Sequence, residues 1–166
     1  MKSKFRKAVA FLALAAGIGI ATSPSALGQT QQSEQGIQGT WLFLISIKNC
    51  STGAQIGQPF LSLLTFNQGG TLTETTANPM FFPAERGPGH GDWAVYGPHS
   101  YKAVSMALIT ANGDLVRTQT ITQTIELLSA NSLRTTKASV EFFKPDGTLL
   151  SAGCAAATAQ RIGLPQ

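Results

Sequence analysis

The segment Gly39-Thr40-Trp41-Leu42-Phe43-Leu44-Ile45-Ser46-Ile47-Lys48 has a large apolar residue at every second position from Trp41 onward. Successive side chains of an extended strand point to opposite faces, so Trp41, Phe43, Ile45 and Ile47 would share one face. The spacing therefore predicts a β-strand with an apolar inner face.

The same alternation continues along the chain after this strand. Apolar residues recur mostly every second position, and Gly, Asn, Asp and Pro interrupt the runs, which is typical of strands joined by turns. The predicted strands are Gly39–Lys48, Phe60–Asn67, Thr71–Ala77, Gly91–Tyr96, Ser100–Thr110, Leu115–Leu128, Leu133–Lys144 and Thr148–Ala159. Short connections favour antiparallel neighbours. We therefore expect an all-β domain, either an eight-stranded antiparallel up-and-down barrel or a β-sandwich, with a short helix over Ala152–Gln160 as an alternative for the last strand.

The chain begins like a secretory signal peptide. Basic residues at positions 2, 4, 6 and 7 precede the apolar run Ala8–Ala21, which is too short to span a bilayer, and the small residues Ala26-Leu27-Gly28 follow. We expect cleavage before Gln29. The predicted organisation is a signal peptide over residues 1–28, a flexible leader over 29–38 and a single β-domain over 39–166. The mature protein should be secreted or periplasmic, with no membrane span.

Loss of the signal peptide also removes the net positive charge. The formal charge of +4 belongs to the full chain, and the mature part keeps eight Lys and Arg residues against eight Asp and Glu. A chain without excess positive charge offers no general electrostatic attraction to nucleic acid, so we expect no nucleic-acid partner.

The chain contains two cysteines, Cys50 and Cys154. An exported protein folds in an oxidising compartment, so a disulfide bond between them is expected. A Cys-x-x-Cys spacing or a neighbouring His, which would favour a redox or zinc pair, is missing. We therefore predict neither a metal nor a cofactor.

The first strand begins with Gly39-Thr40-Trp41, and Arg161 follows the last strand. This pair resembles the signature of lipocalins and the wider calycin group, in which a Gly-x-Trp lies at the closed end of an eight-stranded barrel under an Arg from the end of the last strand. The resemblance implies structural roles for Trp41 and Arg161 in a lipocalin-like barrel. The family's Thr-Asp-Tyr motif has no counterpart, since Ser129-Ala130-Asn131-Ser132 stands at that place. The layout also resembles small secreted bacterial proteins of no assigned activity.

Residue spacing favours the barrel over the sandwich. Closing a barrel pairs the first strand with the last, and a nearly constant register could pair Trp41 with Arg161 and bring Cys50 close to Cys154. Cys50 is nine residues from Trp41, and Cys154 is seven residues from Arg161. Both numbers are odd, so the cysteines point to the face opposite the one that Trp41 and Arg161 share. The disulfide should then bridge the outside of the seam.

In such a barrel, alternate connections fall at alternate ends. The two long ones, Asn49–Pro59 and Asn78–His90, would both lie at the open end, opposite Trp41, where a ligand would enter. The second contains an apolar cluster that we expect either to ring the mouth or to plug the core. The predicted ligand-binding residues are Met80, Phe81, Phe82 and His90 at the mouth and Phe43, Ile45, Gln119, Ile121 and Gln123 along the walls.

The two glutamines come from the strand Leu115–Leu128, where Thr residues occupy one face. The opposite face puts Gln119 and Gln123 inside, and buried amides need hydrogen-bond partners. A ligand or ordered water would supply these partners, and so would a core network with Ser105 or Tyr101.

Catalytic motifs are scarce in this sequence. His90-Gly91-Asp92 places a carboxylate two residues from an imidazole, but the flanking glycines more simply indicate a tight turn, and the common hydrolase and nucleotide-binding motifs are missing. We expect a binder of a small apolar ligand rather than an enzyme. The alternative is a secreted protein-binding barrel, such as a protease-inhibitor-like module, and the outward pair Leu42 and Leu44 suggests a homodimer contact.

Overall fold

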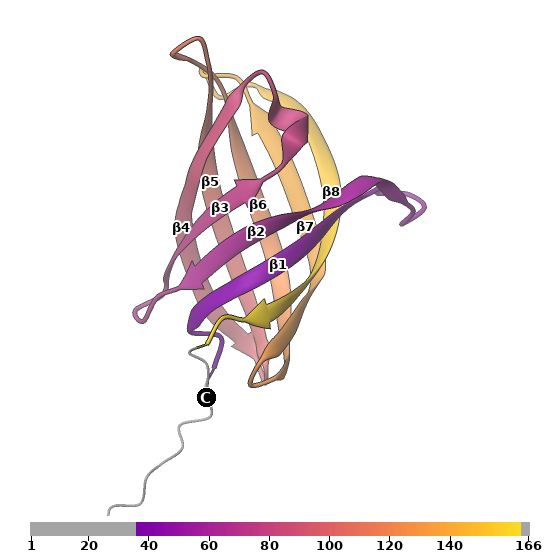
Figure 1. Cartoon of the computed structure of the whole chain (residues 1–166), viewed down its shortest axis with the longest axis vertical. Coiled ribbons are helices and arrows are strands. Elements are labelled where there is room, and N and C mark those ends of the chain that lie inside the picture. Colours follow the sequence, from indigo (N-terminus) through magenta and orange to yellow (C-terminus); the bar gives the residue numbers. More distant parts are fainter. Residues whose placement is uncertain (1–35, 164–166) are drawn as a thin grey trace, which may run out of the picture. The chain divides into compact units, whose positions relative to one another are not determined.

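The computed structural model describes residues 36–163, which form a closed barrel of eight antiparallel strands (Figure 1). Each strand pairs with its neighbours in sequence, and β1 pairs with β8 to close the sheet. The strands are β1 (Gly39–Lys48), β2 (Gln55–Phe66), β3 (Thr71–Ala77), β4 (Glu85–Gly97), β5 (Ser100–Ala111), β6 (Asp114–Ser129), β7 (Ser132–Phe143) and β8 (Leu149–Arg161). The predicted up-and-down barrel is confirmed. The sandwich is wrong, and so is the helix over Ala152–Gln160, because those residues belong to β8, which pairs with β1 and with β7.

Two strands begin earlier than the sequence predicts. β2 starts at Gln55 rather than Phe60, and β4 starts at Glu85 rather than Gly91. In both places, residues typical of turns lie inside a strand whose pairing changes register. The β1–β2 pairing shifts between Ile45 and Ile47 of β1, and the β4–β5 pairing shifts between Arg86 and Gly89 of β4. Such bulges allow a strand to continue through Gly and Pro. The predicted long loop after β3 is therefore a short connection that contains the 3-10 helix η1 (Pro79–Phe81).

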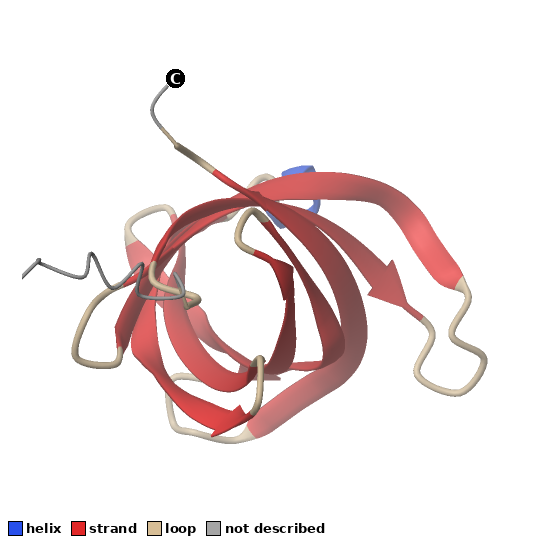
Figure 2. Ribbon diagram, turned by 90° about the horizontal axis from the view of Figure 1, so that it is seen from below, coloured by secondary structure: helices blue, strands red, loops and turns tan. Residues whose placement is uncertain are grey.

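Successive connections between strands lie at alternate ends of the barrel. The β3–β4, β5–β6 and β7–β8 connections lie at the upper end in Figure 1, and the β2–β3, β4–β5 and β6–β7 turns lie at the lower end. Seen from below, the strands form a closed ring (Figure 2). The lower end is the one that the sequence predicts to be closed, because Trp41 lies there.

Large apolar side chains fill the closed end. Trp41 and Ile37 are completely buried, and the indole Nε1 of Trp41 donates a 2.7 Å hydrogen bond to the carbonyl oxygen of Ile37. The buried cluster comprises Ile37, Trp41, Phe43, Leu64, Phe66, Leu72, Tyr101, Ala103, Ile125, Leu133 and Ala159. Ile37 belongs to the segment that the sequence assigns to a flexible leader. The end of that segment is thus part of the core, whereas residues 29–35 and the predicted signal peptide lie outside the described residues.

Arg161 covers this cluster from below. Its guanidinium carbon lies 4.1 Å from the centroid of the Trp41 ring, and the two residues are paired in the β1–β8 ladder. The guanidinium donates hydrogen bonds to the carbonyl oxygens of Gly36 at 2.7 Å, Ala130 at 2.6 Å and Gln38. The stacking and pairing implied by the lipocalin-like signature are therefore present.

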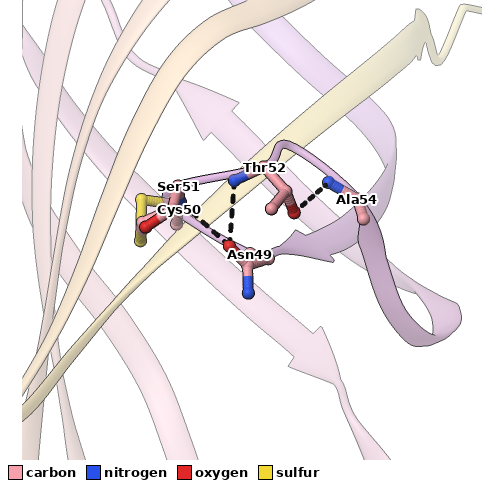
Figure 3. The surroundings of a disulfide bond; sticks show 6 residues. Asn49, Cys50, Ser51, Thr52 and Ala54 are labelled. Atoms are coloured by element: carbon pink, nitrogen blue, oxygen red, sulfur yellow. Dashed lines mark hydrogen bonds between the residues drawn. A yellow bond between two sulfur atoms is a disulfide. The ribbon is translucent and has the colours of Figure 1, made fainter.

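The β1–β8 seam is also held covalently. Cys50, just after β1, forms a disulfide bond with Cys154 of β8 (Figure 3). Cys154 pairs with Lys48, the last residue of β1. The turn that carries Cys50 is shaped by Asn49, whose side-chain oxygen accepts hydrogen bonds from the backbone N–H groups of Ser51 and Thr52 at 2.9 and 3.0 Å. The bond closes a separation of 104 residues, which on the chain-entropy account stabilises the fold by about 4–5 kcal/mol.

Candidate functional site

The upper half of the barrel is hollow. A cavity of about 290 Å³ lies above the packed closed end, between β1, β2, β3, β6, β7 and β8, with η1 at its mouth. Most of its wall is apolar. The apolar lining includes Phe43, Ile45, Ile47, Phe60, Leu64, Met80, Phe81, Ile121, Ala138, Val140, Phe142, Ala155, Ala156 and Ala157.

The composition of β8 explains why this half is hollow. Ala155, Ala157 and Ala159 pair with Ile47, Ile45 and Phe43 of β1, and these residues face inward. Near the closed end Trp41 and its neighbours fill the space beside β8, whereas higher up Ala155, Ala157 and Gly153 present little side-chain volume. A Cβ atom added at Gly153 would have no heavy atom within 4 Å. The alanine-rich strand therefore creates the cavity.

The 3-10 helix η1 forms part of the mouth. Asn78 caps it by accepting a 3.0 Å hydrogen bond from the N–H of Met80, and Phe81 turns inward so that its ring centroid lies 6.3 Å from that of Phe142. Met80 lines the cavity but is 72% exposed. Phe82 is 86% exposed and lines only a shallower depression beside η1. The predicted apolar cluster is therefore divided, with Phe81 packed inward and Phe82 in solvent.

Seven of the nine residues predicted to bind ligand line the cavity. They are Phe43, Ile45, Met80, Phe81, Gln119, Ile121 and Gln123. Phe82 and His90 do not line it. Phe82 follows η1 and is exposed beside the mouth, whereas His90 is not at the mouth. His90 lies within β4, paired with Thr73 and Met106, and is exposed on the outer face of the barrel.

The glycines beside His90 do not form the tight turn that the sequence suggests. Both lie within β4, where a side chain would collide with its surroundings. A Cβ atom at Gly89 would overlap the carboxyl group of Glu74, and one at Gly91 would overlap the backbone of Val104. These residues are therefore explained by close packing.

Glu74 and Arg86 form a buried ion pair that the sequence analysis missed. Both side chains are only 2% exposed, and Arg86 also donates from Nε to the side-chain oxygen of Gln119. The β3–β4 ladder ends at the pair Glu74–Gly89, so this ion pair joins β3, β4 and β6 where backbone hydrogen bonds between β3 and β4 stop. Glu74 alternates with the apolar Leu72, which could have identified it as an inward-facing residue. Arg86 lies among Gly and Pro residues, which predict a loop rather than a strand.

The buried amides have partners other than the expected ones. Gln119 accepts from Arg86, and Gln123 accepts a 3.1 Å hydrogen bond from the hydroxyl of Thr135. Ser105, one of the two expected partners, has a buried hydroxyl oxygen with no hydrogen bond within the described part of the chain. The core network expected for the glutamines therefore exists, but with Arg86 and Thr135 in place of Ser105 and Tyr101.

Arg117 lines the cavity between its mouth and Gln119. Its Nε atom is buried and has no hydrogen-bond partner among the residues 36–163, and its guanidinium carbon lies 5.3 Å from the centroid of the Phe142 ring. Arg117 lies two positions before Gln119, so strand alternation puts both residues on the same inner face. Its register beside Gln119 was the signal that could have identified it.

These features define an eight-stranded antiparallel barrel with a packed closed end and an apolar cavity at the other. A scan against models of protein families finds no match, and a search of curated proteins finds no similar sequence. Across residues 36–163, no group of three or more His, Cys, Asp or Glu side chains is placed to hold a metal ion. The described part of the chain also has no helix that is long and apolar enough to cross a membrane.

Proposed function

We propose that this protein is an exported, lipocalin-like binding protein that holds a small, mostly apolar ligand in the cavity at its open end. The observation that carries the proposal is the cavity of about 290 Å³ with its largely apolar wall. Small-molecule sites typically measure about 300–1,000 Å³, so the ligand should be small. A ligand that buries about 200 Å² of apolar surface there would gain about 5 kcal/mol.

The proposal of export is supported by two features. The basic and apolar residues at the start of the chain have the pattern of a signal peptide, and the Cys50–Cys154 disulfide is of a kind that persists in oxidising compartments. A bacterial periplasmic or extracellular location would also let the barrel meet small molecules from the environment.

The binding test uses a neutral fluorescent probe, N-phenylnaphthylamine, so that charge does not influence the result. The purified protein should bind it saturably. Gly153→Leu and Ala157→Leu put additional side-chain volume into the cavity and should abolish binding, while Thr158→Leu, which adds a leucine to the exposed face of the same strand, should leave it unchanged. Native mass spectrometry of protein purified from its own source would then look for the natural ligand.

A negative result would favour the other candidate. If the probe does not bind and no small molecule co-purifies, the cavity is not a ligand site, and a secreted protein-binding barrel becomes the better description. If the probe binds equally to the Gly153→Leu and Ala157→Leu variants, it occupies the outer surface and the proposed site is wrong.

A further inference from the structure

Three charged side chains face the interior of the barrel above the closed end. Two of them, Glu74 and Arg86, neutralise each other in the buried ion pair. The third is Arg117. Among the described residues that line the cavity, Glu74 and Arg117 are the only ones with a charged side chain, so the interior keeps one uncompensated positive charge.

Strand geometry places this charge near the mouth. β6 runs from the open end to the closed end, and Arg117, Gln119, Ile121 and Gln123 lie successively deeper on its inner face, until Ile125 reaches the packed core. Gln123 lies six positions after Arg117, which is about 20 Å along an extended strand. A molecule bound along β6 would have one end beside Arg117 and the other among apolar groups deeper in the barrel.

Among the described residues, no carboxylate forms a salt bridge with Arg117. Its buried Nε–H also has no acceptor among these residues. A buried donor without an acceptor is costly, more so on a charged group. The Phe142 ring stabilises the cation from one side but accepts none of its in-plane hydrogen bonds.

We propose that the natural ligand is an amphipathic carboxylic acid whose carboxylate binds Arg117 and whose apolar body lies between Ile121, Val140 and Ala157. This inference rests on the proposed binding function and specifies its ligand class. A planar guanidinium matches a carboxylate through paired hydrogen bonds, and the apolar wall below it supplies burial for a hydrocarbon body. Gln119 does not satisfy the donors of Arg117 in place of a carboxylate, because its side-chain oxygen already accepts from Nε of Arg86.

The test compares decanoate with decanol, which share one chain length and differ in the head group, by isothermal titration calorimetry. The wild-type protein should bind decanoate at least about tenfold more tightly than decanol, as expected for a charge-assisted pair in a partly buried site. Arg117→Gln should lower the ratio of decanoate affinity to decanol affinity to about one. The matched control is Arg134→Gln, which removes an exposed positive charge from β7 and should keep the preference.

A second measurement avoids dependence on a variant. In wild-type protein labelled at arginine, the Nε–H resonance of Arg117 should shift with decanoate and not with decanol. If both molecules bind equally well and that resonance is indifferent to decanoate, Arg117 only packs on Phe142, and the inference is overturned while the binding function stands. If neither molecule binds and the neutral probe also fails, the binding function itself is wrong, and this inference falls with it.

Discussion

The guanidinium of Arg161 closes one end of the barrel because its planar shape satisfies two requirements together. One face stacks on Trp41, and the edge donates to three backbone carbonyl groups that the sheet leaves unpaired. Burial lowers the pKa of Arg161 from its ordinary value, and the charge of Tyr101 partly opposes this change. The stacking and the hydrogen bonds both use the positive charge of the guanidinium.

Arg161→Ala should lower the free energy of unfolding by about 2–4 kcal/mol, since it removes a cation–π contact and several charged hydrogen bonds. Arg161→Lys should recover little, because an ammonium group cannot stack on the indole and reach three carbonyl groups at once. Urea denaturation would measure both changes. Binding of the neutral probe at the opposite end should be unaffected, and an unchanged stability in the alanine variant would contradict the structural role.

Gly39 is required by the same arrangement. Its φ of 118° is unfavourable for other residues, and a Cβ atom would lie 2.8 Å from Nη1 of Arg161. Gly39→Ala should therefore destabilise the fold by about 1–3 kcal/mol. Gly153→Ala, at a position with open space, should change the melting temperature little. Equal melting temperatures for the two variants would show that the close approach of Arg161 does not need a glycine.

Among the elements, β3 has the weakest backbone connection to its neighbour. Its ladder to β4 spans only Thr71–Glu74, and the Glu74–Arg86 ion pair continues the connection inside the barrel. Gly89 has no side chain, and this leaves the space that the Glu74 carboxyl group occupies. The ion pair thus substitutes for missing strand pairing.

Glu74→Gln should cost about 3–5 kcal/mol, because it leaves the buried charge of Arg86 without a counter-ion. The barrel provides its own control in the exposed pair Glu126–Arg134, where Glu126→Gln should cost about 0–1 kcal/mol. Chemical denaturation of both variants gives the comparison. Similar small losses at the two sites would mean that Arg86 finds another way to be neutralised.

The element η1 provides a second matched pair. Phe81 is buried against Phe142, and Phe82 is exposed. Phe81→Ser should lower the melting temperature and weaken probe binding, since large-to-small changes at buried aromatic positions cost about 3–5 kcal/mol. Phe82→Ser should alter neither. Loss of binding on replacing Phe82 alone would place the ligand in the depression beside η1 instead of the barrel.

At the scale of the whole molecule, period-two alternation and short connections predicted eight antiparallel strands, while the closure of β1 on β8 was predicted from register and from the lipocalin-like resemblance. Those properties depend on local spacing and on a register that Trp41, Arg161 and the cysteines share. Alternation also placed Gln119, Ile121 and Gln123 on the inner wall. The Glu74–Arg86 pair could not be predicted, because Arg86 lies among Gly and Pro residues that form a bulge, and a bulge depends on the neighbouring strand rather than on local sequence.

The end of the segment before β1, which the sequence alone describes as a leader, packs against the barrel. Ile37 is buried under Trp41, and the carbonyl groups of Gly36 and Gln38 accept hydrogen bonds from Arg161, so this segment completes the closed end. A chain that starts at Gln29, the expected mature terminus, should be fully stable. One that starts at Gly39 should lose about 2–4 kcal/mol through the loss of one buried isoleucine and two charged hydrogen bonds. Urea denaturation of the two purified chains would decide the matter, and equal midpoints would mean that Trp41 and Arg161 close the barrel without help from residues 36–38.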